Sequence, residues 1–89
     1  MIICAAIKDT RTGAVFGGIR HGSIYSAMHD AGITPSHAAA IEGFLDEMGS
    51  FYDRYDAYIV AMNNGQISAT VRQCKREKGE KELYSEDLY

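Results

Sequence analysis

Apolar residues form a continuous run over residues 1–7, MIICAAI, and a second run over residues 14–19. A run this short and rich in isoleucine predicts a buried β-strand rather than a solitary helix. The residues between the two runs read DTRTG, which predicts a turn with Gly13 at positive φ. The pattern therefore predicts an antiparallel β-hairpin. Within it, Gly17 and Gly18 indicate a bulge or a close backbone approach.

Helical spacing occurs twice in the rest of the chain. Ser23 can cap a helix that Gly32 ends, and Asp53 can cap a second helix that Gly65 ends. Behind each cap, apolar residues recur at i, i+3, i+4 and i+7, which predicts two amphipathic helices with one apolar stripe each. The stripes consist of Ile24, Ala27, Met28 and Ala31 in the first helix and Tyr55, Tyr58, Ile59 and Met62 in the second.

A second hairpin is predicted just before the second helix, at the start of residues 42–66 (EGFLDEMGSFYDRYDAYIVAMNNGQ). Residues 43–45 and 51–52 form its short strands, and Gly49 supplies the positive φ of its turn. Asp56 then places a second carboxylate in the first turn of the helix, where its negative charge interacts favourably with the helix dipole. The rest of the chain is arranged around this hairpin and helix.

The last part of the chain changes character twice. Residues 66–71 alternate apolar and polar side chains, which predicts a final strand with one buried face. Residues 72–82 are nearly all charged and predict a solvated loop or a mobile tail. Residues 83–89, LYSEDLY, regain apolar character, so we expect a tail that docks on its own body or on a neighbouring subunit. The order ββαββαβ places residues 1–89 in one α+β domain, with a small, mostly antiparallel sheet and two helices.

Composition narrows the classes of function. A chain of 89 residues with 46% apolar content forms one domain with a small core, and such chains often gain stability by oligomerising. The formal charge of −3 disfavours DNA and RNA partners, so any phosphate site must be a local cluster of arginines. Cys4 and Cys74 fit neither a metal pair nor a disulfide framework. No apolar run approaches the roughly 20 residues of a membrane span, and no signal peptide is recognisable, so we expect a cytosolic protein.

Candidates for catalysis are weak. His21, His29 and His37 are spaced by eight residues and lie outside the zinc patterns HxxxH and HExxH, so we expect no metal site and no cofactor. Ser23 lies near His21, but no nucleophile elbow accompanies it, and a helix cap explains it better. We therefore expect a protein that is not an enzyme. The alternative is a hydrolase that uses His21 or His37 as its acid–base residue.

Arginines and aromatic residues form the stronger pattern. Arg54 opens the second predicted helix, where free N–H groups attract anions, and Phe44 and Phe51 lie close to it in sequence. Aromatic rings together with arginine can stack a base and hold its phosphates, although the same rings also suit the core. Further phosphate candidates are Arg11 and Arg20, which flank the first hairpin, and Arg72, which ends the predicted last strand.

Three segments of the chain resemble a family of small phage proteins. They are IICAAIKDTRTGAVFGGIRHGSI, EGFLDEMGSFYDRYDAYIVAMNNGQI and LYSEDLY. The family is the phage anti-Thoeris sponge, the first type of Thoeris anti-defence protein. Its members carry an ICAAIK…G…RH start, a GF(L/V)D…G.F..R.EA……GQI core and an LYSE(N/D)LY end. The resemblance covers nearly the whole chain. The chain departs from it at Tyr55 and Asp56, where an acidic pair is usual, and in its short link between Pro35 and Ile41, where longer members carry an insertion.

The resemblance implies a binding role without catalysis in the cytoplasm of the bacterial host. Thoeris defence makes a cyclic ADP-ribose isomer as an alarm signal, and the sponge sequesters that signal, glycocyclic ADP-ribose, without degrading it. Members of the family assemble from dimers into hexamers. Some also bind cyclic di- or trinucleotides at a separate site.

The resemblance also implies roles for particular residues. Phe44 and Arg54, ten residues apart, match the family's binding aromatic and its partner, so we expect the ring to stack on adenine and Arg54 to pair with the pyrophosphate. Arg72 matches a signal-gripping arginine, and Phe51 completes the expected ligand site. We expect a second anion site from Arg11 and Arg20 where subunits meet. A third class of function remains open, in which the protein inhibits a host defence enzyme by binding it directly.

Overall fold

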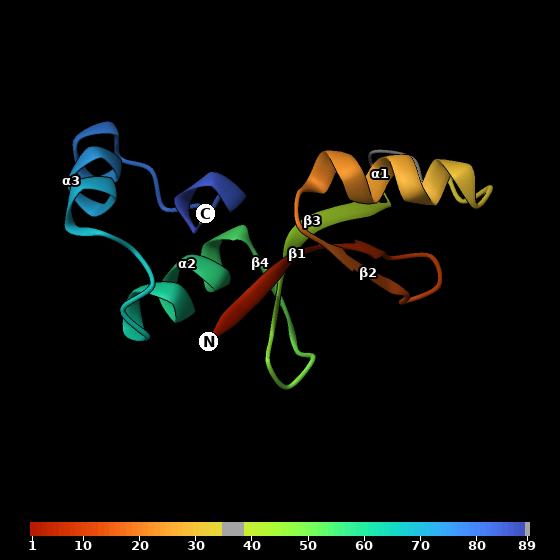
Figure 1. Cartoon of the computed structure of the whole chain (residues 1–89), viewed down its shortest axis with the longest axis horizontal. Helices are drawn as coiled ribbons and strands as arrows, with labels where there is room; N and C mark the ends of the chain where they lie inside the picture. The colour runs from red at the N-terminus through yellow and green to blue at the C-terminus, as the bar shows by residue number, and fades with distance from the viewer. Residues whose placement is uncertain (35–38, 89) are drawn as a thin grey trace.

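The computed structural model of the protein describes residues 1–34 and 39–88. The helices and strands, in chain order, are β1 (Ile2–Asp9), β2 (Val15–Gly18), α1 (His21–Asp30), β3 (Ala40–Asp46), β4 (Phe51–Asp53), α2 (Arg54–Asn63), α3 (Ala69–Lys78) and the short 3₁₀-helix η1 (Ser85–Asp87) (Figure 1). The strands form one antiparallel sheet in the order β2-β1-β3-β4. The predicted α+β class is confirmed.

Both predicted hairpins are present in the sheet. β1 pairs with β2 and also with β3, so that Ala5 lies opposite both Gly18 and Phe44. Gly13 and Gly49 take positive φ values of 76° and 80° in the two hairpin turns, as predicted. β1 is therefore a central strand, which explains why its sequence is apolar at almost every position.

One face of the sheet carries the core. Cross-strand neighbours point to the same side, so the register places Ala5, Ile7 and Phe44 on this face. α1 packs Ile24 and Met28 against it, and α2 packs Ala57, Ala61 and Tyr58 against it. In Figure 1, α1 and α2 cover adjoining parts of the sheet. The fold is thus a two-layer arrangement with both helices on one side.

α1 begins earlier than the sequence pattern predicts. The helix starts at His21, and Arg20 is its extended N-cap residue, with φ −131° and ψ 149°. Ser23 contributes to this end from inside the helix, because its hydroxyl donates to the carbonyl of Arg20 at 2.8 Å. The earlier start gives His21 a buried position that the predicted stripe did not include.

α2 has the predicted ends but buries a different stripe. The Asp53 carboxylate accepts a hydrogen bond from the backbone N–H of Asp56 at 2.8 Å, as an N-cap residue should. The fully buried residues of the helix are the small Ala57 and Ala61, which let it approach the sheet closely. Of the four predicted core residues, Tyr58 is buried, whereas Tyr55, Ile59 and Met62 are exposed. The predicted apolar stripe therefore lies mainly outside the core.

The predicted last strand and charged loop are wrong, because α3 occupies most of residues 66–82. Ser68 caps this helix by accepting a hydrogen bond from the N–H of Val71 at 3.2 Å. Gly79 ends it in the left-handed conformation, with φ 70°. An N-cap serine followed by ten helical residues outweighs the short alternation of residues 66–71.

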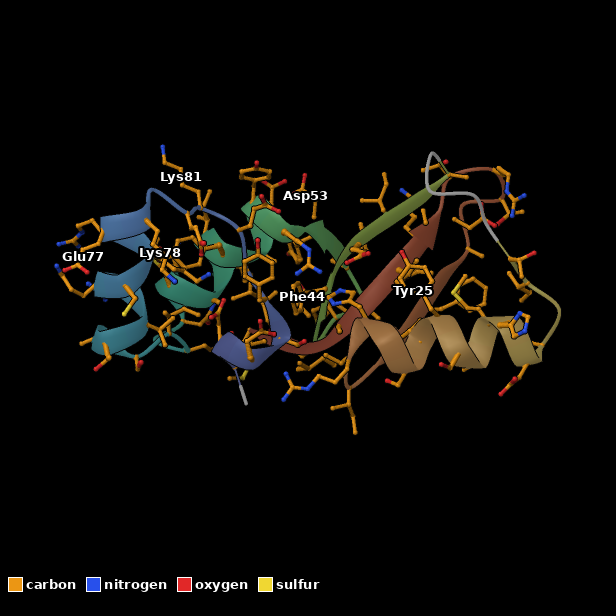
Figure 2. The ribbon with its side chains drawn as sticks, turned by 90° about the horizontal axis from the view of Figure 1, so that it is seen from above. Tyr25, Phe44, Asp53, Glu77, Lys78 and Lys81 are labelled. Atoms are coloured by element: carbon orange, nitrogen blue, oxygen red, sulfur yellow. The ribbon has the colours of Figure 1, made fainter. Side chains whose placement is uncertain are left out.

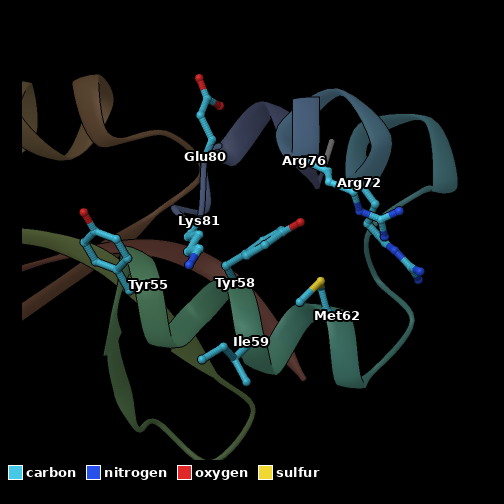
Figure 3. Close-up of a pocket in the computed structure, with 8 residues that line it drawn as sticks. All are labelled: Tyr55, Tyr58, Ile59, Met62, Arg72, Arg76, Glu80 and Lys81. Carbon is cyan, nitrogen blue, oxygen red and sulfur yellow. The ribbon is translucent and has the colours of Figure 1, made fainter. Parts of the chain in front are cut away.

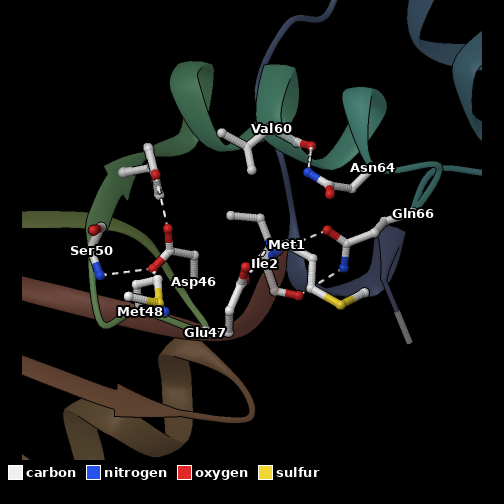
Figure 4. Close-up of polar contacts among 10 residues, drawn as sticks. Met1, Ile2, Asp46, Glu47, Met48, Ser50, Val60, Asn64 and Gln66 are labelled. Atoms are coloured by element: carbon white, nitrogen blue, oxygen red, sulfur yellow. Dashed lines mark hydrogen bonds and ion pairs between the residues drawn. The ribbon is translucent and has the colours of Figure 1, made fainter.

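Gln66 makes one strand-like contact in place of the predicted strand. Its side-chain amide donates to the Ile2 carbonyl at 2.7 Å and accepts from the Ile2 N–H at 2.8 Å (Figure 4). A single side chain thus satisfies both backbone groups at the start of β1. This contact ties the segment after α2 to the sheet.

The predicted tail docks on its own chain. Leu83 is fully buried, and its N–H donates to the Arg54 carbonyl at 2.9 Å. Lys75 of α3 secures the same segment, because its ammonium donates to the Glu82 carbonyl at 2.8 Å and pairs with Asp87 at 2.8 Å. Tyr89, the last residue of the predicted tail, lies outside the described residues.

Candidate functional site

A pocket of about 380 Å³ lies between α2 and α3 (Figure 3). We call it the α2–α3 pocket. α2 contributes the side chains that form its aromatic and apolar wall. α3 and the link behind it contribute the charged wall. The lining residues are Tyr55, Tyr58, Ile59 and Met62 from α2, Arg72 and Arg76 from α3, and Glu80 and Lys81 from the link.

Helical spacing explains why these residues converge. The four lining positions of α2 recur at i, i+3, i+4 and i+7, so they form one stripe on the helix. Arg72 and Arg76 are four residues apart and therefore lie on one face of α3. Figure 3 shows Tyr58 projecting from α2 toward the arginine side of the pocket.

The pocket is cationic. Arg72, Arg76 and Lys81 supply three positive charges, against one carboxylate from Glu80. The negative charge of Glu82 and a hydrogen bond to its carboxylate raise the pKa of Tyr55, so this hydroxyl stays protonated and is held at the edge of the pocket. Aromatic rings, hydroxyl groups and guanidinium groups together suit a planar ligand that carries phosphate.

Lys75 supports the floor of the pocket without lining it. Its ammonium lies 5.5 Å from the centroid of the Tyr58 ring and 4.7 Å from that of Tyr84. The same group holds Asp87 and the Glu82 carbonyl, so one buried cation joins α2, α3 and the tail. The tail therefore fixes the position of α3 and, with it, the shape of the pocket.

A second polar cluster surrounds Arg54, away from the pocket lining. The guanidinium pairs with Glu42 at 2.6 Å and donates to the Leu83 carbonyl at 2.7 Å. It also lies over the Tyr84 ring, 4.8 Å from the centroid, and 3.4 Å from Nδ1 of His21. We call this set the Arg54 cluster. It joins α2, β3, α1 and the tail.

Burial sets the protonation of the Arg54 cluster. Burial in the core lowers the pKa of His21, so the ring is neutral at neutral pH. Its Nε2 lies 2.9 Å from the Gly43 carbonyl, where it acts as the donor. Burial raises the pKa of Glu42, but hydrogen bonds from Arg54 and Tyr25 outweigh that effect and leave it lowered. The carboxylate is therefore ionised and paired.

Comparison with known proteins gives one family. A sequence model of the family described as phage T4 y16D protein matches residues 1–89, the whole chain. The protein belongs to the phage T4 y16D protein family. No curated protein and no solved structure matches the chain.

In this member of the phage T4 y16D protein family, the expected ligand residues do not meet. Arg72 lines the α2–α3 pocket, whereas Phe44 is fully buried in the core between α1 and α2 (Figure 2). The His21 ring packs edge-on against Phe44, with centroids 5.3 Å apart. Neither face of the Phe44 ring is open to a ligand in this structure. Phe51 lies on the opposite face of the sheet.

Arg54, which was expected to pair with the pyrophosphate of a ligand, is occupied by groups of its own chain in this structure. Its side chain is only 16% exposed, and its N–H groups bind Glu42 and the tail. Arg54 therefore holds the buried segment at Leu83 against the start of α2. Phe44 and Arg54 do approach the same residue, His21, but they do so inside the fold.

Arg11 and Arg20 are separated by the length of the first hairpin. Arg11 follows β1 in the turn and pairs with the buried Asp9 at 3.0 Å. Arg20 lies beyond the other end of β2, 4.0 Å from Glu86 of the tail. A single chain does not bring them together, so the expected second anion site could form only between copies.

Of the eight residues that line the pocket, sequence reasoning named Arg72 and missed the other seven, among them Tyr55, Tyr58, Arg76 and Lys81. The two tyrosines were assigned to a core stripe, and the two basic residues to a solvated loop. The available signal was Ser68, followed by Arg72 and Arg76 at helical spacing. A cationic helix face following a tyrosine-bearing helix would have indicated the site.

Within residues 1–34 and 39–88, the structure offers neither a metal-binding cluster nor a helix that could span a membrane. No group of three or more His, Cys, Asp or Glu side chains there could hold a metal ion. No helix in that part is long and apolar enough to cross a membrane. His37, a candidate acid–base residue, lies outside the described residues.

Proposed function

We propose that the protein binds and sequesters cyclic ADP-ribose-type signals in the host cytoplasm without degrading them, and that it binds them in the α2–α3 pocket. The observation that carries this proposal is the meeting of Tyr55 and Tyr58 with Arg72, Arg76 and Lys81 around one cavity. Membership of a phage family and the resemblance to the anti-Thoeris sponge support the same role.

The size and chemistry of the pocket fit such a ligand. Its volume of about 380 Å³ lies within the range of roughly 300–1,000 Å³ typical of small-molecule sites. Stacking of a base on a tyrosine contributes about 1–3 kcal/mol. A guanidinium presents two parallel N–H groups to a phosphate, which favours Arg72 and Arg76 as the pyrophosphate contacts.

Sequestration requires affinity rather than complementarity to a transition state. The wall consists of groups that stack, donate hydrogen bonds and neutralise charge. His21, the candidate acid–base residue within the described part, lies in the Arg54 cluster, with its two ring nitrogens near Gly43 and Arg54. The pocket wall therefore suits binding of an intact ligand.

Calorimetry with glycocyclic ADP-ribose tests the proposal. Arg72→Gln and Arg76→Gln should each weaken binding by about tenfold to a hundredfold, because a hydrogen bond to a charged group contributes about 1.5–3 kcal/mol. Lys78→Gln is the matched control, since Lys78 projects from α3 outside the pocket lining and should leave the affinity unchanged. Arginine variants with wild-type affinity would remove the pocket from the proposal.

Heating the complex separates sequestration from hydrolysis. A sponge returns the ligand with its original mass after denaturation of the protein, whereas a hydrolase returns an opened product. Mass spectrometry of the released nucleotide measures this directly. A product that gains the mass of water would replace the proposed role with an enzymatic one.

A further inference from the structure

The α2–α3 pocket has two chemically different ends. At one end lie Arg72 and Arg76, whose guanidinium groups only donate hydrogen bonds. Figure 3 shows Met62 on this side of the pocket and Tyr55 at the opposite side. Tyr55 and Met62 both lie on α2, where their positions are separated by about 10 Å along the helix axis. A ligand that fills the pocket therefore meets different chemistry at each end.

The Tyr55 end of the pocket presents hydrogen-bond acceptors. The Tyr55 hydroxyl donates its hydrogen to the carboxylate of Glu82, so the phenolic oxygen is left as an acceptor. The carboxylate itself has further lone pairs that the tyrosine does not use. Glu82 and Asp53 both place negative charge near this hydroxyl, and together they outweigh the ammonium of Lys81. We call this side of the pocket the acceptor end.

The backbone around Glu82 is held on both sides. Its carbonyl accepts a hydrogen bond from the buried Lys75 ammonium at 2.8 Å. The next residue, Leu83, is fully buried, and its N–H donates to the Arg54 carbonyl at 2.9 Å. The carboxylate is therefore presented from a fixed segment, which a group that discriminates between ligands requires.

We propose that Glu82 determines which nucleotides the pocket accepts, by binding the hydroxyl groups of a ribose and repelling a phosphate in their place. This inference rests on the proposed function. The pyrophosphate of an ADP-ribose-type ligand pairs with Arg72 and Arg76, and its base stacks on Tyr55 and Tyr58. The ribose attached to the base then lies at the acceptor end. Carboxylates bind ribose hydroxyls in the same way in dinucleotide-binding folds.

A phosphate group on that ribose would remove the favourable contacts and add repulsion. A phosphomonoester carries a charge of roughly −1.5 to −2 at neutral pH, and its oxygens accept hydrogen bonds. Beside Glu82 it would bring like charges together, with acceptors facing acceptors. The pocket should therefore reject a 2′-phosphorylated ligand, although the residues that line it carry more positive than negative charge.

Calorimetry with cyclic ADP-ribose and with cyclic ADP-ribose 2′-phosphate tests this inference. Wild-type protein should bind the 2′-phosphate at least about tenfold more weakly, because like charges meet at the acceptor end. Glu82→Gln keeps an oxygen that accepts from Tyr55 but removes the charge, so it should reduce this preference by about tenfold. Its affinity for cyclic ADP-ribose should fall only about threefold to tenfold, because an amide oxygen is a weaker acceptor than a carboxylate.

Two further variants separate the carboxylate from other causes. Glu77→Gln is the matched control, because it removes a carboxylate from the exposed part of α3 outside the pocket lining and should keep the wild-type preference. Tyr55→Phe removes the hydroxyl but leaves the carboxylate, so it should still favour the ligand without the 2′-phosphate. Loss of the preference in Tyr55→Phe but not in Glu82→Gln would assign discrimination to the hydroxyl and overturn the role of Glu82.

The same titrations distinguish failure of this inference from failure of the proposed function. Equal wild-type affinities for the two ligands, or an unchanged preference in Glu82→Gln, would overturn the role of Glu82 and leave sequestration intact. Wild-type protein that binds neither ligand would overturn the proposed function, and the role of Glu82 with it.

Discussion

Gly43 is a residue whose small size decides the local structure. Its α-carbon lies under the Phe51 ring, and an added Cβ would lie 2.1 Å from the backbone oxygen of Tyr52. Because that neighbour is backbone in the paired strand, it cannot rotate away. The glycine is therefore required for the close pairing of β3 with β4.

Gly43→Ala and Gly22→Ala should change stability in opposite directions. The first creates overpacking and should lower the free energy of unfolding by about 1–3 kcal/mol or more. The second lies in α1 with nothing within 4 Å of the added Cβ, and it should raise that free energy by roughly 0.5–1 kcal/mol. Denaturant unfolding of both variants measures the difference. A neutral Gly43→Ala would show that β4 can shift away from β3.

His21 should make folding stability depend on pH. Burial lowers the pKa of His21 below its ordinary value of 6.5, so the unfolded chain takes up a proton before the folded chain does. The free energy that the neutral ring contributes is fully present above pH 6.5. It is lost as the pH falls below 6.5 toward the lower pKa of the folded state.

Unfolding curves between about pH 7.5 and pH 5 measure this loss, in the range where an ordinary histidine titrates. His21→Gln should be less stable at neutral pH but show a flatter pH dependence across this range. His29→Gln is the control, because His29 is exposed on α1. The interpretation fails if both variants keep the wild-type slope.

At the scale of elements, Lys75 connects α3 to the rest of the fold. Its side chain is 5% exposed and pairs with Asp87, which is 12% exposed. Removing one partner of a buried ion pair leaves the other charge without compensation. The helix and the tail therefore depend on each other for their positions.

Lys75→Met should destabilise the protein by about 3–5 kcal/mol and release the tail. Tryptic cleavage after Lys81 should then accelerate, because the link would no longer be held against α3. Lys78→Met removes a charge from the same helix at an exposed position and should change neither property. Equal unfolding midpoints for the two variants would contradict the linking role of Lys75.

The sequence predicted those helices and hairpins whose ends carry recognisable capping or turn residues. Asp53 and Gly65 bound α2 as expected, and Gly13 and Gly49 mark the two hairpin turns. α3 was missed because its buried residue is a lysine, and the contacts that bury Lys75 come from a tail later in the chain. Ser68 and the helical spacing of Arg72 and Arg76 mark the helix, but no local pattern shows that Lys75 is buried.

The site was less predictable than the fold because it forms between separate elements. Arg72 was expected to bind the ligand and does line the pocket, but it does so from a helix rather than a strand. Phe44 was chosen as an aromatic close to Arg54, yet its alternation on β3 directs it into the core. Whether an aromatic side chain faces solvent or the core depends on the helices and strands that pack around it.

At the scale of the whole molecule, stability is unevenly distributed. β1 and β3 form the centre of the sheet, whereas α3 lies at one end and buries only Lys75 among its side chains (Figure 1). Segments with few buried contacts open locally at a lower cost than the core. The α2–α3 pocket thus has one rigid wall and one wall that opens more easily.

Hydrogen exchange should therefore be fast in α3 and should slow when the signal binds. In the free protein, amides of residues 69–78 should exchange well before those of β1. At a ligand concentration of about 100 times Kd they should slow by up to a hundredfold, because opening then requires release of the ligand. Arg72→Gln, measured at the same ligand concentration, should lose most of this slowing. If exchange slows only in α1 when the ligand is added, the binding site lies at the other end of the molecule. If the α3 amides of the free protein are as protected as those of β1, the tail holds this helix as firmly as the sheet is held.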